Sequence, residues 1–470
     1  MGERPNEDFA AESIHANMLE QIVGSGASQH LIHSYKRSFN GFVASLSTDE
    51  AQKIKATDGV VSVFPNRINQ LHTTRSWSFM GFPLNATHTP LESDIIVGML
   101  DTGVWPESSS FNDTGLGPPP SNKIIGARFY NGGGGGSSDD ILSPRDTEGH
   151  GSHTASTAAG ATVAGASLYG LAQGTAHGAV PSARLAVYKI CWSFGCADAD
   201  ILAAFDDAIA DGVDVISLSV GSPFASDYFE DPIAIGAFHA MKRGVLTSNS
   251  AGNSGPRPST VSNFSPWSLT VAASTIDRKF VADVKLGNGK TYEAPNPMNS
   301  TSNTDAEFAY GAGHINPIKA VNPGLIYDAG EADYVSMLCG QGYNTTKLRL
   351  VTGDNSACSA TNNSTAWDLN YPSMAVTAVA GMPFTASFNR TVTNVGFPSS
   401  TYHPTLILPS GVKFDLTPDT LSFKAIGESQ SFTLKLEGET SEFVVSASLL
   451  WSDGVHGVRS PIVLHAPSVR

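Results

Sequence analysis

The sequence predicts three structural parts: a small α+β unit, an α/β region with a parallel sheet flanked by helices, and an antiparallel β-sandwich. Three observations support this prediction. Short apolar strands alternate with amphipathic helices between residues 93 and 274, and a strand–helix–strand pattern precedes them. The last hundred residues alternate apolar with polar side chains between Gly, Pro and Ser turns. A chain of 470 residues is long enough for two or three such domains.

The first unit is predicted from a strand, a capped helix and a returning strand. FNGFVASLS (Phe39–Ser47) has the composition of a strand, and Ser47 with Glu50 three residues later forms a capping box for a helix through Ile54. GVVSVFPN then returns as a strand. Because so small a unit buries little apolar surface alone, we expect it to pack on the α/β region.

The α/β region contains five predicted strands and one clear amphipathic helix. In the helix, Ile201, Leu202, Phe205 and Ile209 recur at helical spacing until Gly212 ends it. Strands alternating with helices form a parallel sheet covered on both faces, with sites at the carboxyl ends of the strands. The predicted strands are Ile95–Leu100, Leu185–Ile190, Val213–Leu218, Val245–Ser248 and Leu269–Ala273.

The carboxy-terminal sandwich is predicted from five alternating runs separated by turns. Such spacing is typical of an antiparallel β-sandwich, for which we expect a scaffolding role without chemistry of its own. The runs are FTASFNRTVTNV, TYHPTLILP, VKFDLTP, QSFTLKL and FVVSASLLWSD.

Composition excludes several classes of partner. A formal net charge of −15 disfavours nucleic acids and anionic membranes, because both repel an acidic surface. The sequence contains no apolar run of 18 residues, so it predicts no membrane-spanning helix. The polar stretch after Met1 does not resemble a signal peptide. The glycine run in NGGGGGSSDD is not a phosphate-binding loop, since neither Lys-Ser/Thr nor a helix follows it.

Two features nevertheless favour an oxidising compartment. The four cysteines allow three pairings, and the local pairs Cys191–Cys196 and Cys339–Cys358 are favoured where disulfides form; four buried free thiols are the alternative. Eight N-x-Ser/Thr sequons predict glycosylation. The sequons are at Asn85, Asn112, Asn263, Asn299, Asn344, Asn362, Asn363 and Asn389.

Three polar residues follow strands or begin helices in an order that suits acyl transfer. Asp101 follows the apolar run IIVGML, His150 lies in GHGSHTAS, and Asn253 lies in SAGNSGP. A histidine can accept the nucleophile's proton, an aspartate can orient that histidine, and an amide can donate to an oxyanion. Singly, each residue has a structural explanation as a cap, a helix-start residue or a turn. Their order and their neighbours together make the chemical interpretation specific.

These motifs resemble those of the subtilisin-like serine proteases, and most closely the plant cucumisin-like subtilases. DTGVWPES is similar to the family's aspartate motif, GHGSHTAST to its histidine motif and SAGNSGP to its oxyanion motif. The resemblance implies catalytic roles for Asp101 and His150 and an oxyanion-hole role for Asn253. SLSVGS resembles the substrate-pairing strand, which implicates Ser219 and Gly221 in main-chain contacts with substrate.

The resemblance extends over nearly the whole chain and implies its domains. Residues 1–72 resemble an inhibitory propeptide that packs on the peptidase domain, and TTRSWSFMGF from Thr73 resembles a mature amino terminus. Residues 73–345 are then a subtilisin-like peptidase domain, 346–368 a linker and 369–470 a fibronectin III-like domain, which LNYPSMAV opens. The family implies a secreted, apoplastic endopeptidase that cleaves proteins or peptides without a cofactor.

The sequence departs from the family where the nucleophile belongs. LGNGKTYE and PMNS are separated only by Ala294, Pro295 and Asn296, so the protease-associated insert and the Gly-Thr-Ser-Met helix are missing. Ser300 and Ser302 lie nearest this junction, in a polar stretch with no strand-to-helix signal.

Three interpretations therefore stay open. The first is a subtilase that lacks its nucleophile and is inactive as written. The second is a non-catalytic pseudo-protease or inhibitor that acts through the propeptide-like domain, and the third is an unstable fragment. His153, three residues after His150, could form a metal-binding pair with it, but no third ligand has suitable spacing and we expect no metal site.

Overall fold

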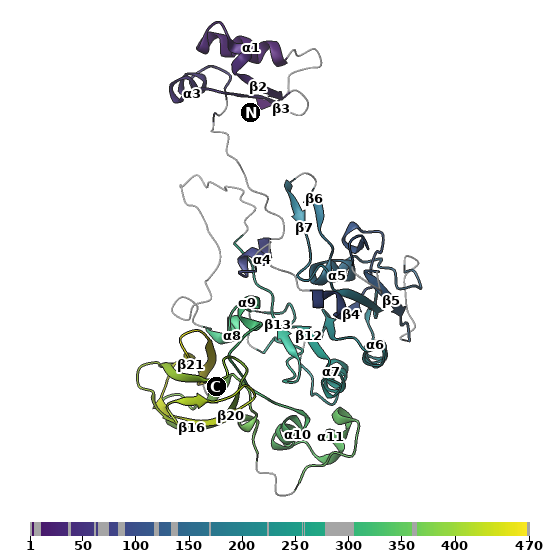
Figure 1. The fold of residues 1–470 in the computed structure, drawn as a ribbon, viewed down its shortest axis with the longest axis vertical. Helices are drawn as coiled ribbons and strands as arrows, with labels where there is room; N and C mark the ends of the chain where they lie inside the picture. Colours follow the sequence, from purple (N-terminus) through teal and green to yellow (C-terminus); the bar gives the residue numbers. More distant parts are fainter. Residues whose placement is uncertain are drawn as a thin grey trace. The chain divides into compact units, whose positions relative to one another are not determined.

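The computed structural model forms two compact units, Met1–Leu71 and His72–Arg470 (Figure 1). The structure describes residues 2–3, 11–35, 39–60, 63, 75–82, 90–116, 122–132, 140–168, 171–222, 225–255, 257, 259–277, 305–359 and 364–467.

The first unit packs helices against a three-stranded antiparallel sheet of order β1-β3-β2. The predicted capping box is present, with the Ser47 amide donating to Glu50 Oε2 at 2.8 Å at the start of α3. Leu19, Ala27 and Ile54 form the buried core. Most of the predicted strand GVVSVFPN lies outside the described residues. The elements are β1 (Gly2–Glu3), α1 (Ala11–Val23), α2 (Ala27–His30), β2 (Leu31–Tyr35), β3 (Phe39–Ala44) and α3 (Thr48–Lys55).

The second unit is built on a six-stranded sheet of order β13-β12-β11-β4-β8-β5, in which every pairing is parallel. All five predicted strands are present within two residues of their predicted ends. The strand β5 was not predicted, because GARF interrupts its apolar pattern. The strands are β4 (Ile96–Asp101), β5 (Ile124–Phe129), β8 (Arg184–Lys189), β11 (Val215–Leu218), β12 (Leu246–Ser250) and β13 (Leu269–Val271).

Helices lie on both faces of this sheet. One face packs against α6 (Asp198–Asp211), whose predicted end at Gly212 is confirmed by a left-handed backbone there (φ 79°), and against α7 (Pro232–Lys242). The other face packs against α5 (His150–Ala159), mainly through Met99 and Val187.

Smaller elements complete the α/β part of the second unit. They are α4 (Arg75–Phe79), a 3₁₀ turn at Pro90–Asp94, another at Ser109–Phe111, the hairpin of β6 (Val163–Leu168) and β7 (Leu171–Ala176), the two-residue pair β9 (Cys191–Trp192) and β10 (Gly195–Cys196), α8 (Glu307–Tyr310), α9 (Pro317–Ala320), α10 (Glu331–Gly340) and α11 (Thr345–Thr352).

The α5 face of the sheet is unevenly covered. Residues paired in a parallel register point to the same face, and Val215 pairs with both Val97 and Leu246. Leu246 and Leu269 on this face are 47% and 45% exposed, whereas Leu218 on the opposite face is 0% exposed. Parallel sheets are normally covered on both faces. Within the part of the chain that the structure describes, the half of the α5 face formed by β12 and β13 is therefore open to a degree that is unusual for this sheet type.

The carboxy-terminal part forms two packed sheets, of order β14-β16-β20-β18 and β15-β22-β21-β17-β19, around a shared apolar core (Figure 1). The predicted sandwich is confirmed, with the correction that β15 pairs parallel to β22. The first sheet also recruits β14 (Leu325–Ile326) from an earlier stretch of chain. The strands are β15 (Met374–Thr377), β16 (Pro383–Asn394), β17 (Ser400–Ile407), β18 (Lys413–Thr417), β19 (Leu421–Phe423), β20 (Ser429–Glu439), β21 (Val444–Ser452) and β22 (Gly457–His465), with a 3₁₀ turn at Ala366–Asp368 before them.

The two local disulfides, Cys191–Cys196 and Cys339–Cys358, are both formed. The first links β9 to β10, and the second ties α10 to the segment after α11. The alternative of buried free thiols is therefore wrong.

The open sheet face leads to a matched pair of substitutions. Leu218→Ala removes a fully buried side chain and should lower the free energy of unfolding by about 3 kcal/mol, whereas Leu246→Ala should cost under about 1 kcal/mol because its side chain already contacts water. Urea unfolding of the second unit measures both. Equal costs would show that the β12 side of the sheet is covered in solution.

The sandwich should fold when residues 369–470 are expressed alone, because its apolar core lies almost wholly within that range. A longer fragment from residue 322 should melt at a higher temperature, because β14 then pairs with the edge of β16. Calorimetry and near-ultraviolet circular dichroism test both statements. A broad transition without a near-ultraviolet signal would contradict independent folding.

Candidate active site

Asp101 is a buried carboxylate at the carboxyl end of the central strand β4, and it is 2% exposed. Its Oδ1 accepts hydrogen bonds from the Thr102 amide and from His150 Nδ1, both at 2.7 Å, and its Oδ2 accepts one from Thr154 Oγ1 at 3.0 Å. A buried charge needs such partners, because an unpaired carboxylate is strongly destabilised away from water. The sequence thus places this group in a site that both stabilises it and fixes its direction.

His150 is the first residue of α5, and its side chain is 54% exposed. The contact from Nδ1 to Asp101 leaves the other ring nitrogen, Nε2, at the exposed end of the side chain. A carboxylate at Nδ1 selects the tautomer in which Nε2 is the free base. The two residues predicted to act together are therefore brought together, in an arrangement suited to general-base chemistry.

Glycines allow the aspartate and histidine segments to approach this closely. A Cβ on Gly151 would lie 2.1 Å from the Gly103 carbonyl oxygen, and a Cβ on Gly103 would lie 2.2 Å from the carbonyl oxygen of Pro144. Gly103 also has φ +97°, a region that L side chains rarely adopt. These backbone contacts explain why the DTG and GHG motifs need glycine at these positions.

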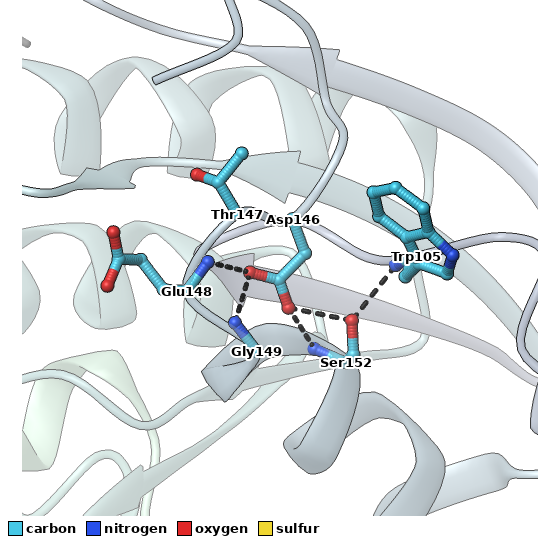
Figure 2. Close-up of a pocket in the computed structure, with 6 residues that line it drawn as sticks. All are labelled: Trp105, Asp146, Thr147, Glu148, Gly149 and Ser152. Carbon is cyan, nitrogen blue, oxygen red and sulfur yellow. Dashed lines mark hydrogen bonds between the residues drawn. The ribbon is translucent and has the colours of Figure 1, made fainter. Parts of the chain in front are cut away.

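Asp146 organises the loop that leads into α5 (Figure 2). Its Oδ1 accepts from the Gly149 amide at 2.8 Å and from the Thr102 hydroxyl at 2.9 Å. Its Oδ2 accepts from both the amide (2.8 Å) and the hydroxyl (2.7 Å) of Ser152. Burial alone would raise the pKa of Asp146, but the hydrogen bonds from Ser152, Gly149 and Thr102 outweigh burial and hold the pKa below its ordinary value.

A buried lysine holds the same loop from the sheet side. Lys189 Nζ donates to the Arg145 carbonyl at 2.8 Å and lies 4.4 Å from the centroid of the Trp192 ring. Lys189 is 0% exposed and is the register partner of Asp101 on β8. Burial lowers the pKa of Lys189, although the carboxylates of Asp146, Asp140 and Glu148 act in the opposite direction. The loop before His150 is thus fixed at both ends.

At the loop that leads into α5 the surface is hollowed into a depression of about 590 Å³ (Figure 2). Its lining comes from Trp105 and from the Asp146–Gly149 loop with Ser152. The Ser152 hydroxyl accepts a hydrogen bond from the Trp105 amide at 2.9 Å, so the depression and the histidine helix share one hydrogen-bond network.

The remaining predicted residues lie at the carboxyl ends of the neighbouring strands. Ser219 and Gly221 follow β11, and Asn253 follows β12 in an exposed turn. Since β4, β11 and β12 are adjacent and parallel, the segments after them leave the same edge of the sheet. No direct contact joins Asn253 to Asp101 or His150 among the residues that the structure describes. The junction at Ala294–Asn296, with Ser300 and Ser302, lies outside the described residues.

Sequence reasoning missed three residues that support this edge. Thr154 holds the second oxygen of Asp101, and Asp146 holds the start of α5. Asn263 was noted only as a sequon, yet its side chain joins the segment after β11, at Val220, to the last residue of β12, Ser250. Of these three, only Asp146 could have been found from the sequence. It lies three residues before Gly149, the N-cap of α5, and aspartate often accepts hydrogen bonds from amides two and three residues on.

Neither a metal site nor a membrane helix is found in the described part of the chain. His150 and His153 do not join a group of three or more candidate metal ligands there. Within those same residues, every helix is too short or too polar to cross a bilayer.

Comparison with protein families agrees with the geometry. Residues 92–402 match the Subtilase family, residues 2–72 match Peptidase inhibitor I9, and residues 368–464 match the Fibronectin type-III domain. The fold and the Asp–His pair therefore define a subtilisin-like serine protease class, with an I9 propeptide domain before it and a fibronectin III domain after it.

The chain belongs to the subtilase family, and its similar relatives are plant proteins. It is 34% identical to subtilisin-like protease SBT4.3 of Arabidopsis thaliana over 700 aligned positions, covering 99% of this chain and 95% of that protein. It is 37% identical to subtilisin-like protease SBT4.10 of the same plant over 658 positions, covering 99% and 93%. Because this chain has 470 residues, at least 230 of the 700 positions aligned with SBT4.3 have no counterpart in it.

The Asp146 network leads to a pH-dependent prediction. Because its folded-state pKa is lowered, Asp146 contributes stability above the unfolded pKa of about 4 and loses that contribution as pH falls through the folded-state value. Asp146→Asn should therefore cost about 2 kcal/mol at pH 7, and the difference from the unsubstituted protein should shrink toward about pH 3.

Urea unfolding at the two pH values measures this effect. Glu107→Gln is the control, because it removes an exposed carboxylate that pairs with Arg145 beside the same loop. The control should leave the unfolding midpoint nearly unchanged. A cost for Asp146→Asn that is the same at both pH values would contradict the role assigned to the ionised carboxylate.

Proposed function

We propose that this chain is a subtilisin-like endopeptidase scaffold that keeps its general base and oxyanion donor but lacks a nucleophile, so that it does not hydrolyse peptide bonds as written. One observation carries the proposal: only Ala294, Pro295 and Asn296 separate LGNGKTYE from PMNS, where the family's insert and serine helix belong. The positions missing relative to SBT4.3 support it.

The roles that we propose follow from the geometry of the carboxyl edge. With a serine present, His150 Nε2 would take the hydroxyl proton, Asp101 would stabilise the resulting imidazolium, and the Asn253 amide would donate to the oxyanion. Ser219 and Gly221 would bind the substrate main chain. Removing the nucleophile from a subtilisin site lowers turnover by about 10⁶-fold, so the remaining groups cannot sustain proteolysis.

The open half of the α5 face supports the loss of a packed element. Leu246, Leu269 and Val271 are each at least 37% exposed on that face, whereas Thr247 of β12 and Leu218 of β11, on the opposite face, are 0% exposed. Covering three such side chains would contribute several kcal/mol, at about 25 cal/mol per Å² of apolar area. A family member with the additional positions has chain available to cover them, and this chain is expected to be less stable than its relatives.

We further propose that the protein belongs to the secretory route and is glycosylated. Two disulfides are typical of oxidising compartments. Among the described sequons, Asn112, Asn344 and Asn389 are exposed. The plant subtilase family is typically secreted, which agrees with this assignment.

A second candidate function is inhibition of a related protease in trans. The match of residues 2–72 to Peptidase inhibitor I9 favours it, as does the separate compact unit that these residues form. Packing of this unit on a peptidase domain would block the substrate edge without any nucleophile. Stoichiometric inhibition of a full-length relative by the intact chain would support this candidate, and undiminished activity at equimolar ratio would exclude it.

The leading proposal predicts the response to a serine-directed probe. The 470-residue protein should not be labelled by a fluorophosphonate, because the sequence between Glu293 and Met298 lacks the family's serine motif. Inserting the missing SBT4.3 positions between Glu293 and Met298 should restore labelling, and His150→Ala in that restored protein should abolish it again.

Gel fluorescence after probe treatment measures these outcomes, with His153→Ala in the restored protein as the matched control that keeps labelling. Labelling of the original 470-residue chain that disappears in its own His150→Ala variant would overturn the proposal. The transcript sequence across the codons for Glu293 and Met298 then decides whether the shorter form is expressed.

A further inference from the structure

We propose that Asn263 is a positioning residue that sets the spacing between the candidate substrate-binding segment, Ser219–Gly221, and the oxyanion loop, Ala251–Asn253. The assignment of those two segments rests on the proposed function. The physical claim concerns Asn263 itself. Its side-chain amide links Val220, which follows β11, to Ser250, which ends β12, just beyond the last register pair between these two strands.

The backbone ladder between β11 and β12 ends just before the site. Its last register pair is Leu218 with Asn249, so the strands are free to separate beyond it. There, Asn263 Nδ2 donates to the carbonyl oxygens of Val220 and Ser250, at 2.8 and 2.9 Å. One amide nitrogen thus replaces the next rung of the ladder, with both of its hydrogens used.

Asn263 is itself firmly held. It is 6% exposed, and its carbonyl accepts a hydrogen bond from Thr270 Oγ1 at 2.6 Å. The preceding amide, of Ser262, donates to the Ala251 carbonyl at 3.1 Å. Its φ of 54° lies in the left-handed region, where asparagine is the best tolerated residue after glycine. The side chain therefore projects from a fixed point on the β13 side of the edge.

The two segments are shaped around this residue. A Cβ on Gly221 would lie 2.9 Å from Asn263 Nδ2, and a Cβ on Gly252 would lie 2.9 Å from Ser262 Oγ. Gly252 also has φ +88°. Both segments thus place a glycine where the Ser262–Asn263 pair approaches, which is the arrangement expected if that pair determines how far apart they lie.

Side-chain chemistry explains why an amide is needed. A serine or threonine hydroxyl has one hydrogen and an ionised aspartate has none, whereas an asparagine nitrogen donates twice. The same observation corrects the interpretation of Asn263 as a glycan acceptor, because a glycan would need the nitrogen that is buried here. In the exposed sequons Asn112, Asn344 and Asn389, the local hydrogen bonds are instead accepted by Oδ1.

The experiment measures hydrogen-exchange protection in the full 470-residue protein. Asn263→Gly keeps the left-handed backbone and removes both hydrogen bonds. Protection of the hydrogen-bonded amides in residues 216–221 and 248–253 should fall together by at least about tenfold, because the opening of both segments depends on the same side chain.

Asn394→Ala is the matched control. Asn394 is 0% exposed and its Nδ2 also bridges two carbonyls, those of Phe397 and Ala425, but in the sandwich. This control should change exchange near Phe397 and Ala425 and leave the hydrogen-bonded amides of residues 216–221 and 248–253 unaffected. General destabilisation would not separate the two variants in this way.

Asn263→Asp tests the donors separately from shape. Near pH 7.5 its carboxylate would face two carbonyl oxygens and should reduce protection at least as much as Asn263→Gly. Near pH 5 a carboxyl buried beside carbonyls is protonated and regains one O–H donor, so protection should partly recover. A role in filling space alone would give no such pH dependence, and Asn263→Gly should show none.

Several results would overturn the proposal: no change in Asn263→Gly, a change in only one of the two segments, or equal protection of Asn263→Asp at both pH values. If Asn263→Gly fails to fold, the pH dependence of Asn263→Asp decides. Fluorophosphonate labelling of the unsubstituted chain would contradict the proposed function and leave the role of Asn263 unaffected. The two failures are therefore distinguishable.

Discussion

Burial of the Asp101 carboxylate is the constraint on which the rest of the site depends. An ionised group with 2% exposure must be surrounded by donors, and the donors come from the residue after β4 and from the first turns of α5. Bringing α5 that close requires glycine at positions 103 and 151, and holding its start requires the Asp146 network. The orientation of His150 is a consequence of satisfying one buried charge.

Much of this arrangement could be predicted from sequence. The alternation of strands and helices predicted the parallel sheet, and the position of Asp101 and His150 after a strand and at a helix start predicted that they meet. The rest depends on interactions that carry no local pattern. β5 has an exposed, interrupted apolar pattern, β14 joins a sheet formed by strands far along the chain, and Asn263 acts through contacts 13 and 43 residues away. Periodicity cannot report such long-range pairings.

The catalytic pair does not need a nucleophile to keep its geometry. Among the described residues, the hydrogen bonds to the Asp101 carboxylate come from Thr102, His150 and Thr154. Under the proposed function, the energetic consequence of a missing helix falls elsewhere, on the apolar side chains of β12 and β13. Retention of the Asp101–His150 geometry is therefore weak support for activity. Exposure of the apolar side chains on β12 and β13 is the observation that bears more directly on the proposed loss of a packed element.

The same separation holds for the substrate side of the edge. β12, β11 and β4 are consecutive in the sheet, so the candidate oxyanion loop, the candidate substrate-binding segment and Asp101 lie in that order along a single edge. Backbone pairing sets their spacing up to Leu218 and Asn249, and the Asn263 amide continues it where pairing stops. Neither the backbone pairing nor the Asn263 hydrogen bonds involve a residue proposed as the nucleophile. Under the proposed function, the chain holds the shape of a substrate edge without cutting a peptide bound there. An inhibitor-like role and a lost catalytic role are therefore alternative proposals for the same fold.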